Sequence, residues 1–141
     1  MRYVVDAPNG KSWFRLETEG EAAQESQLMR HAVEKHFRLE REKAIATYQP
    51  ASKSFIEQDI GLKAHIQRAM PLFLTLRDQD GKSHVTAMLP PGGKPDAGSR
   101  IVIVGPGNAD PYPAEGDAIK ALGDHFGLTL ERERCYPYQR G

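Results

Sequence analysis

Apolar and polar residues alternate in two short stretches near the start of the chain, residues 2–7 and 11–17. The dipeptide between them, Asn9-Gly10, readily adopts the two positive φ angles of a tight hairpin turn. The pattern therefore predicts a β-hairpin. It leaves open which side of the second strand faces the core, because Trp13 and Phe14 are adjacent and both apolar.

A helical pattern follows, with apolar residues mostly three or four positions apart between residues 20 and 48. Thr18 and Glu21 have the spacing of a capping box, and Pro50 would end the helix. The apolar positions are Leu28, Met29, Ala32, Val33, Phe37, Ala44, Ile45 and Tyr48. Because globular helices average about 11 to 12 residues, we expect this helix either to break within residues 38–43 or to project and pack against a partner.

A second, shorter helix is predicted before Pro71. Ser54 and Glu57 repeat the capping-box spacing at its start. Its apolar positions are Phe55, Ile56, Ile60, Ala64, Ile66 and Met70. Proline cannot continue a helix, so the helix should end near Pro71.

Strand patterns dominate the second half of the chain. Residues 71–78 and 83–89 flank an Asp-Gly turn and predict a second hairpin. The apolar run at residues 101–104 predicts a strand buried on both faces. A helix over residues 113–126 and an alternating stretch at residues 129–134 follow, and together with that strand they fit a right-handed βαβ crossover.

These elements predict the fold class α+β. We expect a mostly antiparallel sheet of about six strands in the element order ββααβββαβ, with a long and a short helix in the middle. The single domain would span residues 1–134, and residues 135–141 would form a C-terminal tail.

Charge and composition narrow the classes of partner. The 19 basic and 19 acidic residues cancel, whereas nucleic-acid-binding proteins usually carry a basic stripe. The longest apolar runs fall far short of the roughly 18 residues of a membrane-spanning helix. The start of the chain shows no secretory signal, and the single cysteine fits a reducing compartment. We therefore expect a cytoplasmic protein that binds neither nucleic acid nor membranes.

The loop that follows the apolar run at 101–104 is the predicted ligand site, since ligands often bind beyond a strand that leads into a helix. Three prolines remove N–H donors, and Asp110, Glu115 and Asp117 would repel a phosphate. We expect either a simple proline-braced turn or a pocket for a small neutral or cationic ligand. The ligand-binding residues would be Gly105, Gly107, Asn108, Asp110 and Tyr112.

The sequence contains no recognisable catalytic or zinc motif, and no cofactor is expected. On one helix His31 and His36 would point about 140° apart and could not share a metal ion. Cys135, beside Arg134, is interpreted as a tail cysteine rather than a nucleophile. The alternative is a small acid–base enzyme, with or without a divalent metal ion. Its groups would be Asp110, Glu115, Asp117 and a histidine.

The sequence thus favours a non-catalytic binding or interaction module. The long helix carries more apolar surface than a small sheet can cover, so we expect a homodimer that pairs through this helix. The face in question consists of Leu28, Met29, Val33 and Phe37. Nucleic-acid binding through the same helix is the weaker alternative, because acidic residues interrupt its basic ones.

Overall fold

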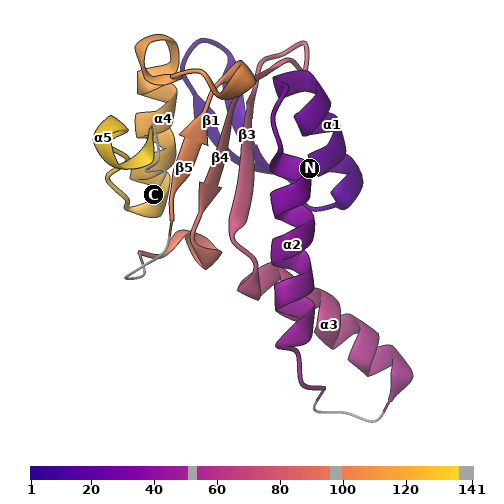
Figure 1. Ribbon diagram of the computed structural model, residues 1–141. Coiled ribbons are helices and arrows are strands. Elements are labelled where there is room, and N and C mark those ends of the chain that lie inside the picture. The colour runs from indigo at the N-terminus through magenta and orange to yellow at the C-terminus, as the bar shows by residue number, and fades with distance from the viewer. Residues whose placement is uncertain (51–53, 96–99, 137–141) are drawn as a thin grey trace.

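The computed structural model describes residues 1–50, 54–95 and 100–136 and confirms the α+β class (Figure 1). Its described part holds a five-stranded antiparallel sheet in which each strand pairs with the next along the chain. The strands are β1 (Arg2–Ala7), β2 (Lys11–Arg15), β3 (Leu72–Arg77), β4 (Ser83–Leu89) and β5 (Val102–Val104). The helices are α1 (Glu19–Met29), α2 (Val33–Ala46), α3 (Phe55–Ala69), α4 (Tyr112–Phe126) and α5 (Arg132–Cys135).

Helices cover both faces of the sheet (Figure 1). Along β3, Leu72, Leu74 and Leu76 point to the face on which α4 packs, whereas Phe73 belongs to the cluster under α1 and α2. This alternation follows from the period of two along a strand. Trp13 is fully buried on the α4 face, and its indole N–H donates to the carbonyl oxygen of Ala118.

The predicted long helix is two helices. Arg30 adopts left-handed backbone angles (φ 54°, ψ 54°) and ends α1, so the break lies at residues 30–32 and not at 38–43. Ser26 stabilises it, because its carbonyl oxygen accepts from the His31 N–H and its hydroxyl accepts from the Glu34 N–H. No glycine or proline marks the break.

The homodimer surface predicted on the long helix is not available. Met29, Val33 and Phe37 are buried, because the turn after α1 folds α2 back against the sheet. Only Leu28 of that face is exposed.

The predicted sixth strand is not formed. Residues 129–131 have no regular structure, and α5 follows, so residues 101–134 do not form the expected βαβ crossover. Leu130 and Cys135 instead join the core under α4. Cys135, the first residue of the predicted tail, is thus buried in the core, and residues 137–141 of that tail lie outside the described residues.

Strand β5 is an edge strand, although its apolar run predicted burial on both faces. Among the described strands it pairs only with β4, and Val102 remains partly exposed. Ile103 packs into the core on the α4 side. Among the described residues, no helix combines the length and apolar character needed to span a membrane.

Candidate functional site

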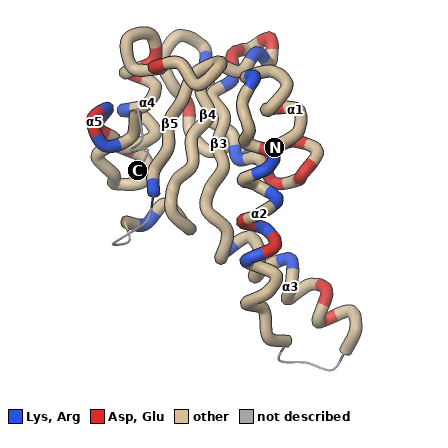
Figure 2. Tube along the Cα trace, in the orientation of Figure 1, with Lys and Arg blue, Asp and Glu red and all other residues tan. Residues whose placement is uncertain are grey.

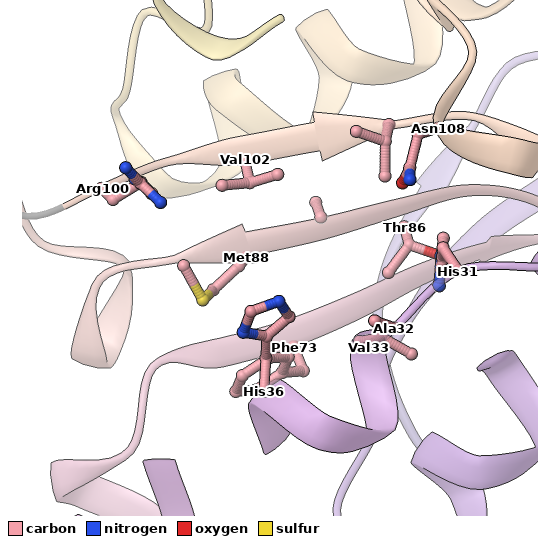
Figure 3. Close-up of a pocket in the computed structure, with 12 residues that line it drawn as sticks. His31, Ala32, Val33, His36, Phe73, Thr86, Met88, Arg100, Val102 and Asn108 are labelled. Atoms are coloured by element: carbon pink, nitrogen blue, oxygen red, sulfur yellow. The ribbon is translucent and has the colours of Figure 1, made fainter. Parts of the chain in front are cut away.

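A cavity of about 170 Å³ lies on the α2 side of the sheet, above β3, β4 and β5 (Figure 3). Apolar side chains make most of its floor, and polar side chains line its rim. The lining residues are His31, Ala32, Val33, His36, Phe73, Thr86, Ala87, Met88, Arg100, Val102, Val104 and Asn108.

The rim of the cavity carries basic and amide groups. Arg100 and Asn108 lie at opposite ends of β5, and His36 projects from α2 toward the same space (Figure 3). None of the described lining residues is acidic. The cavity can therefore accept an apolar body below and hydrogen-bond acceptors at the rim.

Behind the cavity, a buried polar network joins α1 to the sheet. Glu25 is fully buried and pairs with Arg77 at 2.8 Å (Nη2 to Oε1). Its carboxylate also accepts from the hydroxyls of Thr75 at 3.0 Å, Ser83 at 2.9 Å and Thr86. Four donors match the roughly four lone-pair positions of a carboxylate. The buried charge is thus fully hydrogen-bonded, which burial of an ion requires.

A bulge in β4 helps to assemble this network. Arg77 pairs with Ser83, although the residue before Arg77 pairs with Val85. One extra residue, His84, is therefore inserted in β4. The shift brings the Ser83 hydroxyl to the face of the sheet where Glu25 lies.

The network also determines the protonation of His31. The Thr86 hydroxyl donates its hydrogen to Glu25, so it can only accept from His31, whose Nε2 lies 2.9 Å away. In the neutral ring, Nδ1 then carries a lone pair. This atom is buried and has no hydrogen-bond partner among the described residues. Burial lowers the pKa of His31 below its ordinary value of 6.5.

The arrangement suits a structural role better than proton transfer. Solvent does not reach Nδ1 of His31, so a ligand in the cavity has no path to that lone pair. The chain of hydrogen bonds from Glu25 through Thr86 to His31 instead attaches the α1–α2 turn to β4. That turn forms one wall of the cavity.

Of the five predicted ligand residues, Asn108 lines the cavity. Its backbone is left-handed (φ 63°), and its carbonyl oxygen accepts from the Tyr136 hydroxyl at 2.9 Å. Gly107 also has a positive φ, and the Gly105 N–H donates to the carbonyl oxygen of Ala109 at 2.7 Å. These contacts make the loop a tight turn that presents Asn108.

Asp110 and Tyr112 hold the C-terminal segment in place. Asp110 accepts from the Tyr112 N–H at 3.0 Å and from Arg132 Nε at 2.6 Å. The Tyr112 hydroxyl donates to the carbonyl oxygen of Leu130, and burial raises the pKa of Tyr112. Neither residue lines the cavity.

The acidic cluster proposed for an acid–base enzyme is not assembled. Glu115 pairs with Lys11 at 2.7 Å, Asp110 pairs with Arg132, and Asp117 is exposed on α4. Within the described ranges, no three His, Cys, Asp or Glu side chains lie close enough to hold a metal ion. Burial raises the pKa of the Cys135 thiol, which disfavours its use as a nucleophile.

The histidines are distributed differently from the sequence-based expectation. His31 and His36 both line the cavity, because the chain turns at Arg30 and the two residues no longer share one helix. His65 and His84 lie elsewhere and bind Thr47 and Asp78 respectively.

Sequence reasoning missed Glu25 and its partners, although a signal was present. Ala22, Glu25 and Met29 have helical spacing and are all buried. A carboxylate on the buried face of a helix needs partners. Arg77, the one charged residue of strand β3, is the matching signal on the sheet.

Comparison of the chain with models of protein families, with curated proteins and with solved structures gives no match. The function is therefore inferred from the cavity and its rim.

Proposed function

We propose that the protein is a non-catalytic binding module whose cavity holds a small, mainly apolar molecule with a carboxylate or a similar acceptor group. The observation that carries this proposal is the apolar floor beneath a rim with Arg100, His36 and Asn108. A cavity of about 150 Å³ in another protein holds benzene, so the volume of about 170 Å³ suits a ligand with one ring.

The charge of the rim favours an acidic ligand over the neutral or cationic one expected from sequence. That expectation depended on Asp110, Glu115 and Asp117, and none of them lines the cavity. Arg100 does line it. Because Arg100 is exposed, its pairing with a ligand carboxylate should gain at most about 1 kcal/mol, and ligands that differ only in charge should rank in the order anion, neutral, cation.

Two features support binding without catalysis. Thr86 is the one hydroxyl-bearing residue among the described lining residues, and it already donates to Glu25. The Nε2 atom of His31 points to Thr86, and its Nδ1 atom is buried. A base and a nucleophile within reach of one ligand are what catalysis would need, and these contacts do not provide them. The single, buried cysteine agrees with a reducing compartment, so the cytoplasm stays our expectation.

Titration with three ring compounds that differ in their head group tests the proposal. Benzoate, benzamide and benzylammonium are added to the ¹⁵N-labelled protein, and amide shifts are followed by NMR. We expect benzoate to bind most tightly, in the millimolar range typical of so small a ligand, and benzylammonium least. The shifts should be largest in the α1–α2 turn, β4 and β5.

Two matched variants locate the site. Ala32 and Ala46 are both exposed, one at each end of α2, but only Ala32 lines the cavity. Ala32→Phe should fill part of the cavity and abolish benzoate binding, and Ala46→Phe should leave it unchanged. Equal binding by both variants, or shifts confined to another surface, would refute the proposed site.

A further inference from the structure

The ends of α2 and α3 form an arm that extends beyond the sheet (Figure 1). Its inner side is closed by contacts between the two helices. The Tyr48 hydroxyl donates to the carbonyl oxygen of Gln58 at 3.3 Å, and His65 Nε2 lies 3.1 Å from the carbonyl oxygen of Ala44. A Cβ at Gly61 would lie 2.3 Å from the hydroxyl of Tyr48, which follows the end of α2. This side of α3 therefore packs closely against the end of α2 and the residues after it.

The outer side of α3 is apolar and exposed. Ile56, Ile60 and Ala64 are four residues apart and form one stripe, which we call the outer stripe. Ile56 is 72% exposed and Ile60 62% exposed, and the neighbouring Phe55 is 88% exposed. Sequence periodicity predicted an apolar face here, but the sheet does not cover it. Adjacent apolar side chains left in water typically mark an interaction surface.

We propose that the outer stripe is a homodimer interface in which the α3 helices of two copies pack antiparallel. The twofold axis would pass near position 62, so that Ile60 of each copy packs on Ala64 of the other. A large side chain then meets a small one at the centre, which allows the helices to approach to about 8–10 Å.

Charge complementarity identifies a second copy as the occupant. The exposed acids Glu57 and Asp59 lie in the first half of α3, and the exposed bases Lys63 and Arg68 lie in the second half (Figure 2). Antiparallel packing places each acidic half opposite a basic half. Parallel packing would place like charges together.

The flanks of the stripe agree with this register. Asp59 and Lys63 lie on the same flank, because their side chains form an ion pair at 3.1 Å within the helix. In an antiparallel pair related by a twofold axis, residues on the same flank of the two helices face each other. Lys63 can therefore give up its ion pair with Asp59 of its own helix and pair with Asp59 of the second copy. Exposed pairs contribute little on their own, and such an exchange therefore costs little.

The small size of the arm predicts a weak dimer. Stable interfaces bury about 800 Å² per partner, and contact along one stripe of two 15-residue helices offers less than that. We expect a dissociation constant of the order of 100 µM, independent of the ligand site. Sedimentation equilibrium of the full chain up to about 1 mM should show a monomer–dimer equilibrium. A monomer throughout that range would overturn the proposal and leave the stripe to a different protein.

Matched variants test the surface. Ile60→Glu should raise the dissociation constant at least about tenfold, since it places a charge in an apolar contact. Leu28→Glu, at an exposed apolar position on α1, should not change it. Circular dichroism and thermal unfolding of the monomer check that both variants fold. Equal effects of the two substitutions would reject the outer stripe as the interface.

A charge exchange tests the antiparallel orientation. Lys63→Glu alone should weaken the dimer, because its flank becomes acidic throughout. Combining it with Asp59→Lys restores one acid and one base on that flank, so the double variant should regain at least part of the lost affinity. Failure of the double variant to recover would exclude the proposed pairing.

Discussion

Replacing Glu25 by methionine should destabilise the protein by about 3–5 kcal/mol, the usual cost of breaking one side of a buried ion pair. Methionine is close to glutamate in size, so the substitution removes the charge without opening a large cavity. The Arg77 side chain, only 6% exposed, would keep its contacts with Thr75 Oγ1 and the carbonyl oxygen of Gly81. Its positive charge would have no counter-ion in the described network.

The hydroxyl groups add less to this cost than their number suggests. Thr75, Ser83 and Thr86 would all lose their acceptor, and an unsatisfied buried donor costs about 1–3 kcal/mol. However, Thr75 Oγ1 and Ser83 Oγ already lie 2.9 Å apart and can bond to each other. The expected loss therefore stays at about 3–5 kcal/mol, a large share of the roughly 5–15 kcal/mol by which a typical domain is stable. The melting temperature should fall by about 10 °C or more.

Urea unfolding followed by fluorescence measures this free energy directly, because the single tryptophan, Trp13, is fully buried. The double variant Glu25→Met with Arg77→Met is the informative companion. It removes both charges, so it should be more stable than Glu25→Met alone. If Glu25→Met costs less than about 1 kcal/mol, or if the double variant is the less stable one, the pair does not stabilise the fold as we argue.

Three further predictions concern individual residues. Burial lowers the pKa of His31, so below about pH 6.5 the unfolded chain binds more protons than the folded protein. The unfolding free energy should therefore fall as the pH drops from about 7 to 5. A His31→Gln variant should lose less unfolding free energy over the same pH range. The Cys135 thiol is buried and its pKa is raised, so a disulfide reagent should label it slowly in the folded protein and rapidly in urea; fast labelling of the folded protein would contradict the packing of α5. Gly93→Ala would bring a Cβ to 2.3 Å from the Phe126 ring at a positive φ and should cost about 2–5 kcal/mol. Gly107→Ala has a similar φ but nothing within 4 Å, so urea unfolding should show a cost of only about 1–2 kcal/mol.

Features encoded by a few neighbouring residues were predictable from the sequence. Asn9 and Gly10 have φ angles of 65° and 72°, as the hairpin turn requires. The Thr18–Glu21 capping box is present at the start of α1. In each case the side chain or its absence determines the backbone angle locally, so the signal does not depend on the rest of the fold.

Features that depend on distant partners were not predictable in this way. The alternation of apolar and polar residues at 129–134 is compatible both with an edge strand and with a loop followed by a short helix. Leu130 and Cys135 pack against the α4 core, whereas Arg132 pairs with Asp110, and these contacts decide the structure. The outer stripe of α3 also could not be predicted to be exposed. Its apolar residues have the spacing of a helix that packs in a core, but the sheet does not reach it.

The candidate cavity depends on the helix break at Arg30, which the sequence pattern had placed within residues 38–43. On one continuous helix, residues five apart point about 140° away from each other, which is why His31 and His36 were not expected to meet. The left-handed Arg30 turns the chain between α1 and α2, and both histidines then line one cavity. Left-handed backbone is costly for arginine, so the turn needs support from its surroundings. Ser26 bonds it locally, and Glu25 holds it to β4 through Thr86 and His31. The buried ion pair that stabilises the fold therefore also maintains the cavity wall.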